Sequence, residues 1–234
     1  MYQNLQKNKG LVENIFNKVF DKYDLMNDLM SLGAHRKWKK NLISIMNPSE
    51  HNNLIDVGCG TGDIGKLFSE ATNKKGKVMN IDPNIKMLNQ GKKKLSNYKN
   101  IEWRQMSAEK LDIPDNTFDN YTISFGLRNT KDLNKSISEA YRVLKKGGKF
   151  LCLEFSKIHN ENLNFIYKKY SKILPTIGNF IVGDEKPYEY LIQSIDEFVN
   201  QAELLEIMKN NHFENCNFRS LSGGIVAIHS GWKI

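Results

Sequence analysis

Short apolar runs alternate with amphipathic segments through the middle of the chain. The runs predict strands, and the segments between them, which carry apolar residues at helical spacing, predict helices. The expected strands cover residues 54–57, 78–82, 101–106, 118–125 and 149–155, and the expected helices between them cover residues 64–72, 84–95 and 133–144. Strand followed by helix at this rhythm predicts an α/β fold with a doubly wound, mostly parallel sheet.

Two helical regions flank this alternation. Residues 11–46 carry apolar side chains at helical spacing and predict two or three helices. Residues 156–212 predict helices and no strand, although one helix is enough to cross to the next strand, so most of 156–200 is expected to be an insertion. Two further strands, near 214–220 and 224–229, bring the expected sheet to seven strands.

The length of the chain, 234 residues, suits one well-buried core rather than two full domains. We expect a single domain in four parts. These are an N-terminal helical cap at 1–48, a cofactor-binding core at 49–155, a helical substrate lid at 156–200, and a C-terminal helix with two strands at 201–234.

The last helix of the expected cap has a basic polar side. Its members are His35, Arg36, Lys37, Lys39 and Lys40. Two interpretations stay open: a helical layer packed on the core, or a cap over the ligand site whose basic side faces lipid head groups.

Composition narrows the class of protein. No apolar run approaches the roughly 18 residues that cross a bilayer, and the N-terminus lacks the apolar core of a signal peptide. Cys59, Cys152 and Cys216 are odd in number and form no Cys-x-x-Cys pair, which argues against a disulfide framework or a zinc site and favours a reducing cytosol. No cluster of His, Asp and Glu has metal-ligand spacing, so no metal is expected.

The net charge of +8 raises the question of nucleic-acid binding. Only five of the 34 basic residues are Arg, and Lys lacks the planar fork that suits bidentate contacts to bases and phosphates. The surplus charge is also spread along the chain. We therefore expect a solvated surface, with attraction to an anionic membrane as the second interpretation and no nucleic-acid partner.

The most informative stretch is residues 54–63, an apolar run that leads into a glycine-rich turn. Gly58, Gly60 and Gly62 permit positive φ and a close approach of the backbone to a ligand, and the first amides of the next helix point to the same spot. We expect this loop to hold a nucleotide-like cofactor. The dinucleotide-binding fingerprint, Gly-x-Gly-x-x-Gly, has its third glycine one residue later than this loop does. A Gly-x-Gly-x-Gly loop after Asp56 instead resembles the loop of the S-adenosylmethionine-dependent methyltransferases of the doubly wound class.

Three further candidates follow the next two expected strands. Asp82 ends the second strand, where a carboxylate can accept both ribose hydroxyls of a cofactor; an ordinary turn acid before Pro83 is the alternative. Ser107 and Ala108 follow the third strand. There we expect backbone contacts to adenine, which a small side chain permits, and a simple loop is the alternative.

Residues 123–129 follow the fourth expected strand, at the edge where such sheets bind ligands. Phe125 either packs in the core or supplies cation–π attraction to a sulfonium. Arg128 and Asn129 either bring polar groups to the mouth of a pocket or lie on the solvated surface. The segment lacks the Asp/Asn-Pro-Pro-aromatic pattern of base-modifying nucleic-acid methyltransferases.

Several segments together resemble one family, the C-methyltransferases of ubiquinone and menaquinone biosynthesis. The stretches that carry the resemblance are residues 19–39, 60–63, 114–119, 123–129, 153–157 and 224–233. The last of them resembles the ubiquinone branch more than the menaquinone-only branch. One departure is Val199, where the family commonly has a proline, so that turn is expected to be less rigid.

The resemblance implies a class I, Rossmann-like methyltransferase that uses S-adenosylmethionine as its methyl donor. By motif match, the family's cofactor contacts correspond to Thr61, Asp82, Ser107, Ala108 and Ser124. Gly58 and Gly60 join them as part of the loop. The resemblance also implies a polyprenylated hydroquinone substrate, action from the cytoplasm at the inner face of a bacterial membrane, and a place in a quinone-biosynthesis complex, with a homodimer as a further possibility.

The expected chemistry needs a nucleophilic ring carbon, which a hydroquinone gains when an adjacent hydroxyl loses its proton. We predict that Arg128 holds the phenolate or positions a water that takes the proton, with Asn129 assisting, since a guanidinium keeps its own proton. Tyr23 and His35 are weaker candidates for orienting the ring or relaying a proton. We expect the prenyl tail to lie between the cap and the 156–200 insertion. The apolar residues expected to line it are Phe165, Tyr170, Ile173, Leu174, Phe180 and Ile181.

Three other functions remain open. The basic charge allows a methyltransferase that acts on RNA or on another small molecule, which would bind RNA with a steep salt dependence. A non-catalytic scaffold within a quinone-synthesis complex would bind S-adenosylmethionine without turnover. An NAD-binding oxidoreductase is the most distant of the three.

Overall fold

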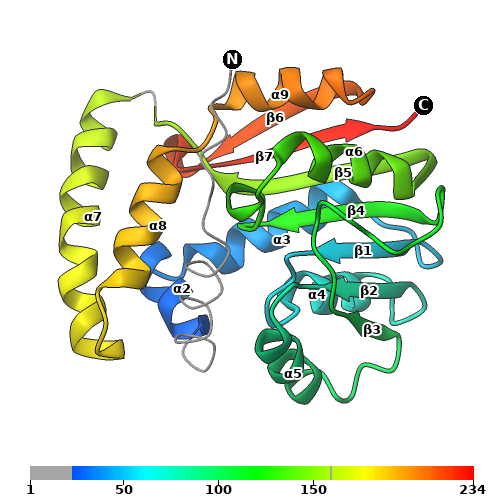
Figure 1. The fold of residues 1–234 in the computed structure, drawn as a ribbon, viewed down its shortest axis with the longest axis horizontal. Helices are drawn as coiled ribbons and strands as arrows, with labels where there is room; N and C mark the ends of the chain where they lie inside the picture. The colour runs from blue at the N-terminus through cyan, green and yellow to red at the C-terminus, as the bar shows by residue number, and fades with distance from the viewer. Residues whose placement is uncertain (1–22, 159) are drawn as a thin grey trace.

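Seven strands form one sheet at the centre of the molecule (Figure 1). The computed structural model describes residues 23–158 and 160–234, and the strand order within them is β3-β2-β1-β4-β5-β7-β6. The strands are β1 (Asn53–Val57), β2 (Lys77–Ile81), β3 (Ile101–Arg104), β4 (Phe118–Ser124), β5 (Leu144–Phe155), β6 (Glu214–Leu221) and β7 (Val226–Trp232). The first five strands pair in parallel, while β7 runs antiparallel to both β5 and β6. This arrangement confirms the predicted doubly wound, mostly parallel sheet.

Helices pack on both faces of the sheet. They are α2 (Tyr23–Ser31), α3 (Ala34–Met46), α4 (Asp63–Ala71), α5 (Ile85–Lys94), α6 (Leu133–Val143), α7 (Glu161–Val182), α8 (Lys186–Asp196) and α9 (Gln201–Asn210), with 3-10 turns η2 (Leu127–Asn129) and η3 (Ser222–Gly224). One core cluster joins the sheet to α3 and α4 around Leu42 and Phe68, and the other joins it to α6 and α9 around Ile137 and Met208. The parallel strands are therefore buried on both faces, which is why their sequences read as apolar runs.

Two features differ from the sequence prediction. β5 begins at Leu144 rather than at the expected Lys149, so Gly147 and Gly148 lie inside the strand, where the pairing register between β4 and β5 shifts. α7 continues through Pro175, although proline donates no helical hydrogen bond and usually ends or kinks a helix. The helix ends at Val182, and the next residue, Gly183, caps it with a φ of 78°, in the left-handed region that favours glycine.

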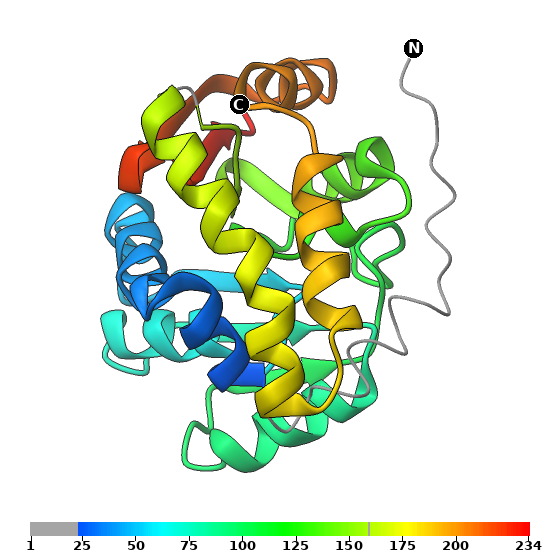
Figure 2. The ribbon, with the colours of Figure 1, turned by 90° about the vertical axis from the view of Figure 1, so that its left-hand side faces the viewer.

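The insertion and helix α2 lie beyond the ends of the parallel strands. In Figures 1 and 2, α2, α7 and α8 stand at the edge where the parallel strands end, and α7 forms the outer margin of the molecule. Trp38 of α3 donates from Nε1 to Ser222 Oγ at 2.8 Å, which ties the N-terminal helices to the turn before β7. Within the described residues, no helix combines the length and apolar character needed to cross a bilayer.

Candidate functional site

The glycine-rich loop after β1 needs its glycines for two reasons. Gly58, Gly60 and Gly62 all have positive φ, at 65°, 55° and 86°. A Cβ on Gly62 would also lie 2.5 Å from Cη2 of Trp103, so that position has no room for a side chain. The Cys59 amide donates to the Ile81 carbonyl at 3.0 Å, which seats the loop on the end of β2. The loop is thus shaped by its own backbone and held against the neighbouring strand.

Asp82 fixes this loop from the end of β2. Its Oδ2 accepts from the Gly60 amide at 2.9 Å, and its Oδ1 accepts from the Asn84 amide at 2.8 Å. Burial raises the pKa of Asp82 to about 6, and the two amide hydrogen bonds oppose that rise. An ionised carboxylate has about four acceptor positions, so it can bind these two amides and still accept from a ribose. Ribose binding by Asp82 stays a prediction.

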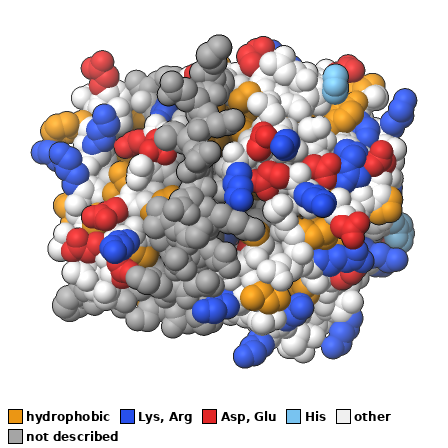
Figure 3. Space-filling view, viewed as in Figure 1, with side chains coloured by type: hydrophobic (Ala, Val, Ile, Leu, Met, Phe, Trp, Pro, Cys, Tyr) orange, Lys and Arg blue, Asp and Glu red, His pale blue; other side chains and the backbone are white. Residues whose placement is uncertain are grey.

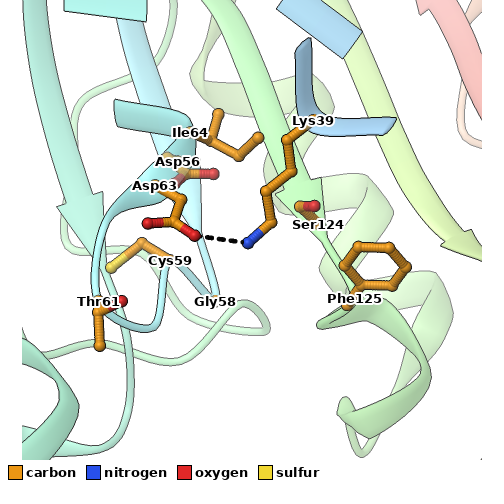
Figure 4. Close-up of a pocket in the computed structure, with 9 residues that line it drawn as sticks. All are labelled: Lys39, Asp56, Gly58, Cys59, Thr61, Asp63, Ile64, Ser124 and Phe125. Carbon is orange, nitrogen blue, oxygen red and sulfur yellow. Dashed lines mark hydrogen bonds and ion pairs between the residues drawn. The ribbon is translucent and has the colours of Figure 1, made fainter. Parts of the chain in front are cut away.

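A pocket opens beside the loop, between the ends of β1 and β4 and helix α3 (Figure 4). Its lining residues are Lys39, Asp56, Gly58, Cys59, Thr61, Asp63, Ile64, Ser124 and Phe125. Two lining side chains each have a buried polar atom, Asp56 Oδ2 and Ser124 Oγ, with no hydrogen-bond partner in the described part of the chain. Buried polar atoms are nearly always hydrogen-bonded, so this pair fits a polar ligand in the pocket.

Asp56 is the most enclosed carboxyl of the pocket. Its Oδ1 accepts from the Thr122 hydroxyl at 2.8 Å, and the side chain is buried within the sheet. Burial raises the pKa of Asp56 to about 7, while the hydrogen bond from Thr122 and the nearby Lys39 oppose the rise. A ligand cation beside Oδ2 would favour the ionised form, which suits an ammonium group.

Lys39 enters the pocket from helix α3 and meets the first residue of α4. Its Nζ lies 2.8 Å from Asp63 Oδ2, while Lys94 Nζ lies 2.9 Å from the other oxygen, Oδ1. Burial alone would raise the pKa of Asp63, but the charges of the two lysines lower it well below its ordinary value. Lys39 is itself buried, which is unusual for a lysine and places its ammonium group in the pocket.

Phe125 closes the pocket at the end of β4. It has a positive φ of 57°, which is uncommon for a residue with a large side chain and is found at functional sites. Its ring contacts the rings of Trp38 and Phe155, with centroids 6.2 Å and 5.0 Å away. The cap helix, β4 and β5 therefore meet in one aromatic cluster next to the pocket.

Arg128 lies in the interior rather than on the solvated surface. Its Nη1 is 2.7 Å from Glu154 Oε1 of β5 and donates to the Phe125 carbonyl at 2.6 Å, and its Nε donates to Ser194 Oγ of α8 at 3.3 Å. Its guanidinium carbon lies 5.4 Å from the centre of the Phe155 ring. Arg128 thus joins β4, β5 and the insertion, which rules out the solvated-surface alternative. A role toward the substrate stays a prediction.

Asn129 binds the insertion as well. Its Oδ1 accepts from the Tyr190 hydroxyl of α8 at 3.0 Å, and its Nδ2 donates to the Phe125 carbonyl at 3.4 Å. Burial raises the pKa of Tyr190, and the charge of Arg128 opposes that rise. Arg128 and Asn129 are therefore brought together with Tyr190 and Ser194 beneath α8.

The remaining predicted residues lie apart from this pocket or outside the described side chains. Ser107 and Ala108 follow β3, where Gln105 Nε2 donates to the Pro83 carbonyl at 2.9 Å and so joins the loops after β2 and β3. His35 does not line the pocket. Its Nε2 lies 2.8 Å from Asp28 Oδ1, which ties α3 to α2, and burial lowers its pKa against the effect of Asp28.

The other expected side chains lie outside the described residues or elsewhere on α7. The Tyr23 side chain lies outside the described part of the structure, as do those of Leu174, Phe180 and Ile181. Phe165 and Ile173 lie on the exposed face of α7, so they do not line a channel between α7 and the core. Tyr170 packs against the core cluster that contains α3 and α4.

Sequence reasoning missed Lys39, Glu154 and Tyr190 as parts of the site. Glu154 did carry a signal, because a charged residue inside an apolar strand needs a buried partner. Lys39 was one of several basic residues on the cap helix, and nothing in the sequence separated it from the others. Tyr190 had no local signal.

The glycine loop, the carboxylate after β2 and the unpaired polar atoms at the carboxyl edge of the sheet define a class I S-adenosylmethionine-dependent methyltransferase. Solved structures support the fold. A Thermotoga maritima S-adenosylmethionine-dependent methyltransferase, a possible histamine N-methyltransferase, matches with a TM-score of 0.65 at 18% identity, over 95% of this chain and 99% of that one. A Haemonchus contortus phosphoethanolamine N-methyltransferase in complex with S-adenosylmethionine matches with a TM-score of 0.63 at 15% identity, over 84% of this chain and 52% of that one.

The chain belongs to the ubiE/COQ5 methyltransferase family, whose model matches residues 2–233. Among its relatives, the Ubiquinone/menaquinone biosynthesis C-methyltransferase UbiE of Rickettsia akari is 47% identical over 97% of this chain and 94% of the relative. The protein of the same name from Rickettsia massiliae is 48% identical over the same shares. The chain is therefore an S-adenosylmethionine-dependent methyltransferase. Within the described residues, no group of three or more His, Cys, Asp or Glu side chains could hold a metal ion.

Proposed function

We propose that this chain transfers a methyl group from S-adenosylmethionine to a ring carbon of a polyprenylated hydroquinone in ubiquinone biosynthesis, menaquinone biosynthesis or both. The substrates would be 2-polyprenyl-6-methoxy-1,4-benzoquinol, demethylmenaquinol or the two together. The observation that carries this proposal is the identity of 47% to a UbiE C-methyltransferase over 97% of the chain.

The residues present fit the methyl donor, which supplies an electrophilic methyl group on a sulfonium. Gly58, Gly60 and Thr61 would hold it along the loop, and Asp82 would accept the ribose hydroxyls. Ser107 and Ala108 would contact the adenine. At the other end of the donor, the unpaired oxygens of Asp56 and Ser124 fit the polar methionine portion.

The protein's main electrostatic task is to favour the phenolate form of the hydroquinone, because the phenolate makes the neighbouring ring carbon nucleophilic. Arg128 would stabilise that oxygen or position a water that removes its proton, since a guanidinium does not act as a base. The ion pair with Glu154 holds the guanidinium in one orientation. Asn129, oriented by Tyr190, would assist. Tyr23 is a further candidate for orienting the ring.

The lipid-like substrate also calls for contact with a membrane, and α7 offers the surface for it. Its outer face exposes Phe165, Ile166 and Ile173, at 60%, 63% and 55% of their accessible area. Figure 3 shows hydrophobic and basic side chains, with acidic ones among them, on the margin of the molecule that α7 forms in Figure 1. A helix face that mixes apolar side chains with lysines fits an anionic lipid surface. We propose that α7 contacts the membrane from the cytoplasmic side.

The basic part of this face consists of Lys168, Lys169 and Lys172, all of which are exposed. Each is expected to add about 1 kcal/mol of attraction to an anionic surface. In sedimentation with phosphatidylcholine vesicles containing phosphatidylglycerol, changing all three to Gln should weaken binding about 100-fold. The double change Lys92→Gln/Lys93→Gln on α5 serves as the control. Equal loss in both variants, or no loss in either, would rule out α7 as the membrane surface.

The methyl transfer itself is tested with labelled donor. The protein is incubated with methyl-labelled S-adenosylmethionine and each of the two demethylated quinols, and mass spectrometry locates the label. We expect the label on a ring carbon of at least one quinol. Donor binding without transfer to either quinol would support a scaffold, and labelled RNA in a parallel incubation would support the RNA methyltransferase.

A further inference from the structure

The cap helix α3 contributes one charged side chain to the donor pocket that the family resemblance did not assign. Lys39 is 8% exposed and lines the same pocket as the unpaired oxygens of Asp56 and Ser124. Figure 4 shows its side chain reaching from α3 toward the glycine loop and the first turn of α4. Its charge is therefore held where the methionine end of the donor would lie.

We propose that Lys39 binds the α-carboxylate of the methionine portion of S-adenosylmethionine. That portion is a zwitterion with one ammonium and one carboxylate, so the site needs a group of each sign. Asp56 supplies the anionic partner through Oδ2. Lys39 is the only cationic side chain among the residues that line the described pocket. The backbone amides at the start of α4 favour an anion at the same place.

The ion pair with Asp63 is compatible with this role. Asp63 binds two lysines, Lys39 on Oδ2 at 2.8 Å and Lys94 on Oδ1 at 2.9 Å. An ammonium has three N–H donors, so Lys39 can bind Asp63 and a ligand carboxylate together. If Lys39 turned fully toward the ligand, Asp63 would still hold Lys94. Because Lys94 stays paired with Asp63, Lys39 can bind the ligand carboxylate without leaving the Asp63 carboxylate unpaired.

A consequence is that the N-terminal cap takes part in donor binding. Lys39 lies one residue after Trp38, whose ring packs on Phe125 and whose Nε1 binds Ser222. The position of α3 is thus set by contacts with β4 and with the turn before β7. A shift of α3 would move Lys39 relative to the donor carboxylate.

The test separates a ligand contact from a structural ion pair by truncating the ligand. S-adenosylhomocysteine keeps the amino-acid end, and 5′-methylthioadenosine lacks it. Calorimetry with Lys39→Met should show about 10- to 100-fold weaker binding of S-adenosylhomocysteine, as expected for a lost hydrogen bond to a charged group. Binding of 5′-methylthioadenosine should change by less than about twofold. Lys39→Arg should restore part of the lost affinity.

Lys94→Met is the matched control, because Lys94 binds the same aspartate and is not among the pocket-lining residues. It should affect the two ligands equally. Equal weakening of both ligands by Lys39→Met would show that Lys39 only supports the loop, and would overturn the proposal. Decarboxylated S-adenosylhomocysteine gives a test that needs no variant: the unaltered protein should bind it at least about 10-fold more weakly, and equal affinity would also overturn the proposal. Neither result bears on which quinol is methylated.

Discussion

The proposed donor side and the proposed substrate side of this enzyme are built in different ways. On the donor side, polar groups are held by backbone amides of nearby loops, as when Asp82 binds the amides of Gly60 and Asn84. On the substrate side, side chains from distant segments bind one another, as when Arg128 meets Glu154 and Ser194. The contacts around the glycine loop are therefore set by nearby segments, whereas those around Arg128 require the insertion to be folded against the sheet.

This difference predicts that the substrate side is the more fragile of the two. Arg128→Ala leaves the carboxylate of Glu154 buried without its partner, so we expect the free energy of unfolding to fall by about 3–5 kcal/mol. We expect kcat to fall by about 10²–10³-fold, because a charge that stabilises the phenolate is lost. Urea denaturation and steady-state kinetics measure the two effects.

Arg142→Ala is the control for this change, since Arg142 also pairs with a glutamate, Glu139, at 2.7 Å, but on α6 and away from the site. It should leave kcat unchanged. Near-normal turnover of Arg128→Ala at full donor saturation would remove Arg128 from the mechanism.

Asp56, on the proposed donor side, should make the free energy of unfolding depend on pH. The pKa of Asp56 is raised from 3.8 to about 7, so the folded protein binds this proton more tightly than the unfolded chain does. The free energy of unfolding should therefore fall as pH rises from about 4 to about 7, and the share from Asp56 is on the order of 3 kcal/mol. Asp56→Asn should flatten the curve in that window. The exposed Asp112→Asn should leave the curve unchanged, and parallel curves for all three proteins would contradict the assignment.

The smallest expected effect concerns the link between Asn129 and α8. Tyr190→Phe removes the hydroxyl that donates to Asn129 Oδ1 at 3.0 Å. We expect a loss of about 0.5–1.5 kcal/mol in the free energy of unfolding and a several-fold lower kcat. Donor affinity should not change. Tyr98→Phe removes a hydroxyl that donates to Glu70 at 2.6 Å on the surface, so an equal fall in kcat for both variants would argue against a positioning role for Tyr190.

The same contrast explains how far sequence reasoning reached. The strands and helices of the core and the glycine loop were predictable, because each depends on short-range patterns such as the spacing of Gly58, Gly60 and Gly62. The burial of Arg128 was not predictable from its neighbours, since its partner Glu154 comes 26 residues later and Ser194 comes 66 residues later. Asp82 was predicted as a site residue from its position after β2, but its hydrogen bond to the Gly60 amide became visible only in the structure.

The continuation of α7 through Pro175 has a related explanation. Helix stability comes mostly from tertiary packing of one face, so a local breaker can be overridden by packing against α8. The start of β5 at Leu144 likewise depends on pairing with Phe118 of β4, which the glycine pattern could not reveal. Both differences arise where distant segments pair.

The most direct test of where the donor binds is to measure donor affinity in one variant beside the glycine loop and one variant at Arg128. S-adenosylhomocysteine binding is measured by calorimetry in Asp82→Asn and in Arg128→Lys. We predict that Asp82→Asn binds S-adenosylhomocysteine about 10- to 100-fold more weakly, because the amide has only one acceptor oxygen in place of the two of the carboxylate. Arg128→Lys should bind it normally, while its kcat falls. Normal binding by Asp82→Asn, together with lost binding by Arg128→Lys, would contradict the placement of the donor beside the glycine loop.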